Sequence, residues 1–308
     1  MRPLRILLMM ITASGLVLGC TSHHEPELPS STDTAAIAER VTGSDGPIFL
    51  RDIASTEWQD DGRRAGDLFA WIPQNAQSSD RQTATRAGES AHAIASFIAD
   101  EKDALDGAPA NSALWQSFAR SLTPYLGAMV GDERGIAGFP PLDGLDSAMR
   151  RTAAVFAMMH RDPEAIRLFT EAATERAHTF ETGFAETAAA EPTLTRSGDA
   201  LEDLMRAARL RGLLAAGAHI ADPESPVATP MHAQTEVMYQ VASRSARPGN
   251  PHISPEFFRD GRLLSPEEIP ESNWSIYDSQ LTVYLAPFRQ ISDAIRQFGQ
   301  RFVVVADQ

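Results

Sequence analysis

Apolar residues recur at helical spacing along most of the chain after residue 80. The clearest run has apolar residues at steps of three and four: Ile166, Phe169, Ala173, Ala177, Phe180, Phe184 and Ala188. Such steps place side chains on one face of an α-helix. Residues 213–220 (LLAAGAHI) are apolar on nearly all sides. We therefore expect the second half of a helix over residues 197–220 to be buried centrally.

Capping residues and prolines predict where these helices begin. Asp162 followed by Pro163 is a strong start, because the Asp side chain accepts a backbone N–H and proline suits the first helical position. Comparable starts are Asp33, Ser79 or Asp80, Asn111 or Ser112, Ser254-Pro255, and Ser265-Pro266 with Glu268 completing a capping box.

Prolines also predict interruptions. We expect Pro73 to stop a short helix over residues 62–72 and Pro124 to kink or restart the helix that carries Phe118. Pro287 should bend a last helix whose apolar stripe runs from residue 281 to 302. Residues 47–55 are compatible with extended or helical structure, and residues 302–305 with a short strand or buried coil.

The order of elements predicts an all-α fold. Gly- and Pro-rich connections at residues 131–144, 222–230 and 246–255 separate helical segments, and no alternating strand-helix pattern occurs. The sequence has no self-similar period of about 34 or 40 residues, which is the pattern that would indicate a helical solenoid. We expect an irregular multi-helix bundle of about eight to ten helices over residues 35–308, with a candidate sub-boundary at residues 222–230.

The N-terminus resembles a bacterial lipoprotein signal. Arg2 and Arg5 precede an apolar run over residues 6–18, and the chain then reads Val17-Leu18-Gly19-Cys20, which is similar to a lipobox. Cys20 is the single cysteine, so it has no partner for an intramolecular disulfide. We expect residues 1–19 to be removed and Cys20 to carry palmitate and further acyl chains. An ordinary secretory peptide and an uncleaved apolar anchor are the alternatives.

Residues 20–34 have the composition of a flexible tether, being polar and rich in Pro and Ser. A flexible segment of this length reaches on the order of 20 Å. Two or three acyl chains bind a membrane far more tightly than one. We therefore expect a domain anchored by lipid to the extracytoplasmic face of the cell membrane.

Composition excludes several function classes. The formal net charge is −14 and becomes −16 once Arg2 and Arg5 are removed with the signal. This charge disfavours nucleic acid and broad contact with an anionic bilayer. Lys102 is the only lysine, beside 26 arginines. A Walker A motif is therefore absent, and no Gly-x-Ser-x-Gly nucleophile elbow occurs.

Two Glu-x-x-His pairs are the sharpest chemical pattern: Glu89 with His92, and Glu175 with His178. In ferritin-like bundles, two such pairs and two further carboxylates hold a di-metal site. Here residues 113–129 contain no acidic residue, and residues 145–160 contain only Asp146. We therefore expect no metal or other cofactor and no catalytic residue, and the four residues stand as metal candidates only.

Four stretches carry a resemblance to a known family: RAGDLFAWI (residues 64–72), TRAGESAHAIASFIA (85–99), LTPYLGAMVGD (122–132) and AVFAMMHRDPEAIRLF (154–169). Together they resemble a family of helical actinobacterial proteins labelled "TPR repeat region", over residues 62–220. The resemblance implies an all-helical fold and an envelope or export setting. Some relatives are associated with secreted or toxin-like proteins. It implies no catalytic residue.

These patterns predict a membrane-anchored lipoprotein whose helical domain is a non-enzymatic binding or interaction protein of the cell envelope. Its expected partner is an envelope protein or an apolar ligand. One alternative is an accessory or immunity-like partner of a secreted effector system, which the family resemblance and not the residues suggests. The other is a di-metal enzyme that uses the two Glu-x-x-His pairs.

Overall fold

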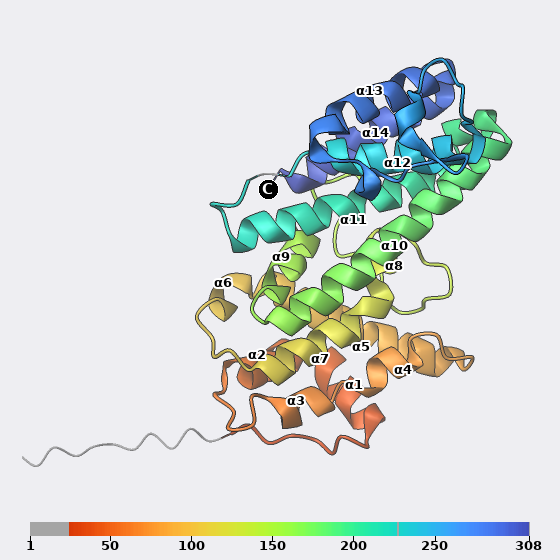
Figure 1. Cartoon of the computed structure of the whole chain (residues 1–308). Coiled ribbons are helices and arrows are strands. Elements are labelled where there is room, and N and C mark those ends of the chain that lie inside the picture. The colour runs from red at the N-terminus through yellow and green to blue at the C-terminus, as the bar shows by residue number, and fades with distance from the viewer. Residues whose placement is uncertain (1–24, 227, 308) are drawn as a thin grey trace, which may run out of the picture.

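Helices form nearly all of the regular structure (Figure 1). The structure is a computed structural model and describes residues 25–226 and 228–307. Its α-helices are α1 (Thr34–Thr42), α2 (Gly46–Ser55), α3 (Arg63–Asp67), α4 (Trp71–Asn75), α5 (Arg81–Asp100), α6 (Lys102–Leu105), α7 (Ser112–Leu122), α8 (Leu126–Met129), α9 (Arg150–Met159), α10 (Pro163–Ala190), α11 (Asp199–Ala221), α12 (Met231–Ser245), α13 (Trp274–Leu285) and α14 (Arg289–Ala306).

The predicted all-α class is confirmed. Ten of the described α-helices have nine residues or more, and α3, α4, α6 and α8 are single turns too short to give a periodic pattern. Five 3-10 turns accompany them: η1 (Thr123–Tyr125), η2 (Pro192–Arg196), η3 (Pro255–Phe257), η4 (Pro266–Glu268) and η5 (Glu271–Asn273). The one described sheet is an antiparallel pair, β1 (Phe258–Arg259) with β2 (Arg262–Leu263).

Aspartates cap three helices at the predicted positions. The Asp33 side chain accepts the backbone N–H of Ala36 at 3.0 Å, and Asp80 does the same for Thr83 at 3.1 Å. Asp162 accepts two N–H groups, from residues 164 and 165, at 3.0 and 2.8 Å. These bonds satisfy N–H groups that have no acceptor within the helix.

Several expected boundaries are wrong, mostly at prolines. Pro73 does not stop a helix but lies in the first turn of α4, where its missing N–H removes no helical hydrogen bond. Pro287 separates α13 from α14 and does not merely bend one helix. Residues 302–305 are neither strand nor coil but the last turns of α14. The starts at Ser254 and Ser265 open only the turns η3 and η4.

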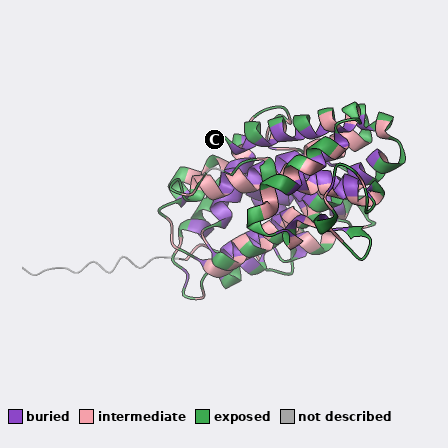
Figure 2. Ribbon diagram, turned by 45° about the horizontal axis from the view of Figure 1, so that its top comes forward, coloured by how far each residue is buried: buried purple, intermediate pink, exposed green. Residues whose placement is uncertain are grey.

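Helices α10 and α11 pack against each other at the centre of the molecule. Helices α9 and α14 pack on α11, whereas α7 and α12 pack on α10; α5 contacts α9, and α1, α2 and α4 lie against α5. Buried residues face inward on all of these helices (Figure 2). A single core extends from Ile37 to Val305. The helices on both sides of residues 222–230 therefore share one core.

Helices α11 and α14 approach closely because α11 has a glycine at the crossing. A Cβ atom at Gly212 would lie 2.8 Å from the Val305 Cβ and 2.9 Å from the Phe302 carbonyl oxygen. The second half of α11 is central, as predicted, but it is not covered on all sides. Leu214 and Ala215 are only half-buried, and both line a groove between the helices.

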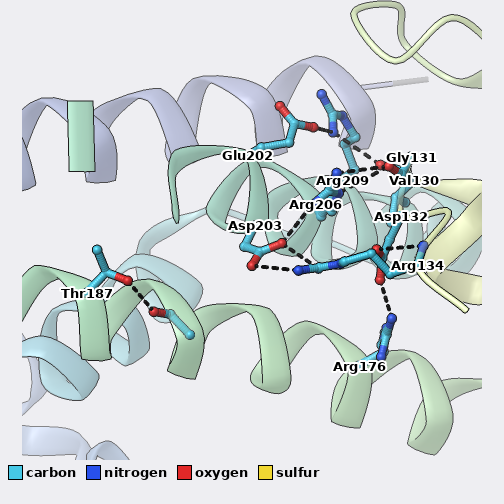
Figure 3. A network of polar contacts seen from close by, with 11 residues as sticks. Val130, Gly131, Asp132, Arg134, Arg176, Thr187, Glu202, Asp203, Arg206 and Arg209 are labelled. Atoms are coloured by element: carbon cyan, nitrogen blue, oxygen red, sulfur yellow. Dashed lines mark hydrogen bonds and ion pairs between the residues drawn. The ribbon is translucent and has the colours of Figure 1, made fainter. Parts of the chain in front are cut away.

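A buried carboxylate ties the loop after α8 to α10 and α11 (Figure 3). Asp132 is fully buried and accepts hydrogen bonds from Arg134 Nε at 2.6 Å and from Arg176 of α10. Arg134 also donates to Asp203 of α11 at 2.7 Å. Arg206 of α11 donates to the Gly131 carbonyl at 3.0 Å. These bonds hold the Gly-rich loop, which was predicted as irregular, in one position.

The expected tether is described only from Glu25 on, and that part lies against the domain. Glu25 forms an ion pair with Arg64 at 2.7 Å, and Leu28 packs against the core. The signal over residues 1–19 and the expected lipidation site Cys20 lie outside the described residues. Across the described helices, none combines the length and the apolarity needed to cross a bilayer.

Candidate ligand-binding groove

A groove of about 1060 Å³ lies where α10, α11, α12 and the start of α13 meet. Its lining residues come from these helices, from α14 and from the connections before α12 and around η4: Thr170, Glu171, Thr174, Glu175, His178, Arg211, Leu214, Ala215, Ala228, Thr229, His232, Ala233, Glu236, Pro266, Glu267, Trp274 and Phe302. Surface hollows with an apolar lining and a few converging polar groups are the usual form of a ligand site.

Arg211, which lines the groove, forms an ion pair with a buried carboxylate. Glu181 of α10 is fully buried and accepts hydrogen bonds from Arg211 of α11, from Nε at 2.9 Å and from Nη2 at 3.0 Å. Burial alone would lower the pKa of Arg211, but the hydrogen bonds and charge of Glu181 outweigh this effect and raise it. The two-point geometry fixes the orientation of the Arg211 side chain in the lining.

A chain of polar contacts continues from this ion pair to α12. Gln240, which is 7% exposed, donates to Glu236 at 3.3 Å, and its Nε2 lies 3.1 Å from His178 Nδ1. The same His178 nitrogen lies 4.0 Å from Glu181. Burial, followed by the negative charge of Glu181, raises the pKa of Glu236. Glu236 is thus a partly desolvated carboxylate beside a second one.

Aromatic and aliphatic side chains form the other wall. The His232 and Trp274 rings lie with centroids 4.3 Å apart, and Leu214, Ala215 and Phe302 line the same hollow. The structure describes all four tryptophans; Trp58, Trp71 and Trp115 are buried, whereas Trp274 is half-buried. Trp274 is therefore the indole whose surroundings change most when the groove is filled.

The lining carries more negative than positive charge. Glu175, Glu236 and Glu267 have no ion-pair partner within 4.0 Å among the described residues. Glu171 is paired with Arg167 at 2.7 Å. Arg211, the one arginine or lysine of the described lining, is engaged by Glu181. The lining therefore presents three unpaired carboxylates and no unpaired arginine or lysine.

Hydrogen bonds between helices fix the walls. Thr235 of α12 donates to Asp278 of α13 at 2.5 Å, and Gln234 donates to the Ile295 carbonyl of α14 at 3.1 Å. The predicted capping box is present at η4, where Glu268 accepts the Ser265 backbone N–H at 3.0 Å. This turn presents Pro266 and Glu267 to the groove.

The two Glu-x-x-His pairs do not converge. Glu175 and His178 line the groove, whereas Glu89 lies on α5 at a separate hollow with Arg81 and Arg86. His92 packs edge-on against the Phe139 ring at 5.4 Å, and burial together with the charge of Arg151 lowers its pKa. Among the described residues, no group of three or more His, Cys, Asp or Glu side chains is arranged to hold a metal ion.

Sequence reasoning missed Glu181, Arg211, Glu236 and Gln240. One signal was available for Glu181: it lies four residues after Ala177 and three before Phe184, and hence on the apolar stripe of α10. A charged residue on such a stripe indicates a buried partner. That the partner is Arg211, 30 residues along the chain, has no local signal.

Comparisons with protein-family models, with curated proteins and with solved structures give no match to this chain. The resemblance to the "TPR repeat region" family therefore stays a prediction.

Proposed function

We propose that this protein is a lipid-anchored, non-enzymatic binding protein of the cell envelope, and that its ligand occupies the groove between α10, α11 and α12. The observation that carries the proposal is the groove itself, whose lining holds an arginine fixed by a buried carboxylate, an aromatic pair and unpaired carboxylates. Acyl chains on Cys20 hold the domain at the extracytoplasmic face of the cell membrane.

The arrangement of the helices supports this proposal. The described chain begins at the end of the molecule formed by α1 to α4, whereas α12, α13 and α14 lie at the opposite end (Figure 1). A lipid attached ahead of Glu25 therefore leaves the groove accessible to other envelope components.

Intact-mass measurement tests the anchor. The full chain is produced with its native signal in a bacterium that processes lipoproteins, and detergent-extracted protein is analysed. We expect a chain that begins at Cys20 and carries two or three acyl groups, and we expect Cys20→Ala to carry none. A product that retains Met1, or an unmodified start at residue 20, would contradict the proposal.

Groove occupancy is tested with cysteine labelling. In a Cys20→Ala background, a single cysteine at Ala233 on the groove lining is modified with a thiol reagent, with and without envelope extract. We expect protection at residue 233 and none at a control site, Ser275 of α13, which is exposed and does not line the groove. Equal labelling of both sites under all conditions would argue against a ligand in the groove.

A further inference from the structure

We infer that the groove binds a basic peptide segment, whose Lys or Arg side chains pair with the carboxylates of Glu175, Glu236 and Glu267. This inference rests on the proposed function and names the chemistry of its ligand. It depends on three features of the lining: its unpaired charges, its aromatic wall and the spread of the carboxylates over separate elements.

The first feature is a half-buried carboxylate, that of Glu236, which forms no direct ion pair among the described residues. Glu236 receives one hydrogen bond, from Gln240 at 3.3 Å. Burial and the negative charge of Glu181 raise the pKa of Glu236, and the charges of Arg211 and His178 offset this rise only in part. Arg211 makes both of its hydrogen bonds to Glu181, so it forms no direct pair with Glu236. A partly desolvated carboxylate without a directly paired cation is unfavourable. A guest ammonium or guanidinium group supplies that direct pair.

The second feature is the aromatic wall. Trp274 and His232 line the groove with their rings in contact, and Trp274 is half-buried, so it is partly exposed. Cations bind favourably over indole faces, and the methylene stems of Lys and Arg pack on apolar surface. Leu214, Ala215 and Phe302 supply that surface. An acidic or purely apolar guest would leave the carboxylates unpaired.

The third feature separates a peptide from a single small amine. Glu175 lies on α10, Glu236 on α12 and Glu267 in η4, so the negative charges belong to three different elements around one open hollow. One monovalent cation cannot pair with all three, whereas successive basic side chains on one backbone can. The net charge of the whole chain, −14, also favours the approach of a basic partner.

Trp274 fluorescence provides a direct test. The lipidated full chain in neutral detergent is titrated with a hexapeptide that alternates Arg and Leu, with the same peptide carrying Glu in place of Arg, and with spermidine. We expect the Arg peptide to change the emission, the Glu peptide to leave it unchanged, and Trp274→Phe to abolish the response. Binding should weaken as ionic strength is raised, because salt screens these charges.

Two glutamine variants and a matched control complete the test. Glu236→Gln and Glu175→Gln should each weaken the Arg peptide about tenfold, because each removes one side of a charge pair. Glu57→Gln makes the same charge change at an exposed residue outside the groove and should leave the affinity unchanged. Glu175 is exposed, so that variant tests the charge without changing a half-buried position.

Several outcomes would overturn the inference. One is that the Glu peptide binds as tightly as the Arg peptide, and another is that the Arg peptide gives no response. A third is that Glu236→Gln and Glu57→Gln bind the Arg peptide with equal affinity. The last is that spermidine binds more tightly than the Arg peptide. Tighter binding of the Glu peptide than of the Arg peptide would rule out a basic ligand but would not contradict the proposed binding function. Absence of acylation at Cys20 would instead count against the proposed anchor alone.

Discussion

At the scale of single residues, buried charges are placed where two or more elements meet. Glu181 pairs with Arg211 between α10 and α11, and Asp132 joins its loop to Arg176 of α10. Both carboxylates are fully buried, so removing their arginine partners leaves an uncompensated charge in the core, which costs far more than breaking an exposed pair. These residues therefore control stability more strongly than the ion pairs at the surface.

Replacing Asp132 should destabilise the protein. We expect Asp132→Asn to lower the free energy of unfolding by about 1 to 3 kcal/mol, because the hydrogen bonds from Arg134 and Arg176 lose their charged acceptor. Denaturant unfolding measures the change. The control is Asp293→Asn, which removes an exposed pair with Arg296 and should cost about 0 to 1 kcal/mol. Similar losses in both variants would contradict the argument.

The Asp132 contribution should also depend on pH. Burial opposes ionisation of Asp132, but the hydrogen bonds and charges of Arg134 and Arg176 outweigh it and lower its pKa below 3.8. A carboxyl with a lowered pKa in the folded state stabilises at pH values above its unfolded pKa, and this stabilisation is lost as pH falls through the folded pKa. The difference between wild type and Asp132→Asn should therefore shrink in acid.

Replacing Glu236 should have the opposite effect on stability. Its pKa is raised in the folded state, so its contribution to stability is complete below the ordinary value of 4.5 and is lost as pH rises through the raised value. We expect Glu236→Gln to stabilise the protein at pH 7 by about 1 kcal/mol while weakening the ligand. Thermal unfolding at several pH values checks this, and a gain that persists unchanged at pH 4 would refute it.

At the scale of elements, local chemistry decides where helices begin and small residues decide how closely they pack. Asp33, Asp80 and Asp162 cap their helices where the sequence predicts. The close approach of α11 and α14 depends instead on Gly212, because no Cβ atom fits at the crossing.

Two glycine substitutions should therefore differ in sign. Gly212→Ala places a Cβ 2.8 Å from the Val305 Cβ and should cost about 1 to 3 kcal/mol. Gly183→Ala lies within α10, where the nearest atom, a carboxylate oxygen of Asp203, is 3.8 Å from the added Cβ. That variant should gain about 0.4 to 1 kcal/mol. Chemical denaturation of both variants measures the difference, and destabilisation of equal size would contradict it.

At the scale of the whole molecule, helices before and after residues 222–230 belong to one folded unit. Helix α14 packs along α11, and α12 packs along α10, so the core is continuous across that connection. The exposed connection therefore separates two stretches of sequence but not two independent cores.

A cut in this connection should leave the molecule assembled. We expect a chain with a protease site inserted after Glu224, an exposed residue, to be cleaved and still elute as one species in native size-exclusion chromatography. A chain that ends at residue 230 should aggregate, because it exposes the apolar side of α11 that α14 covers. Elution of two separate, folded fragments would contradict the single core.

The sequence by itself determined the all-α class, the capped starts and the apolar stripe of α10. Each of these depends on residues within one or two helical turns. It also identified Glu175 and His178 as chemically notable, and both line the groove.

Only the tertiary structure decided which helix packs on which apolar stripe and where the helices leave a groove between them. Periodicity shows that Leu214 is on an apolar helix but not that it lines a groove and stays half-buried. Packing between distant segments pairs Glu181 with Arg211 and brings Gln240 close to both Glu236 and His178. The same packing keeps Glu89 and His92 away from Glu175. Such contacts are set by the shape of the whole core and carry no local pattern.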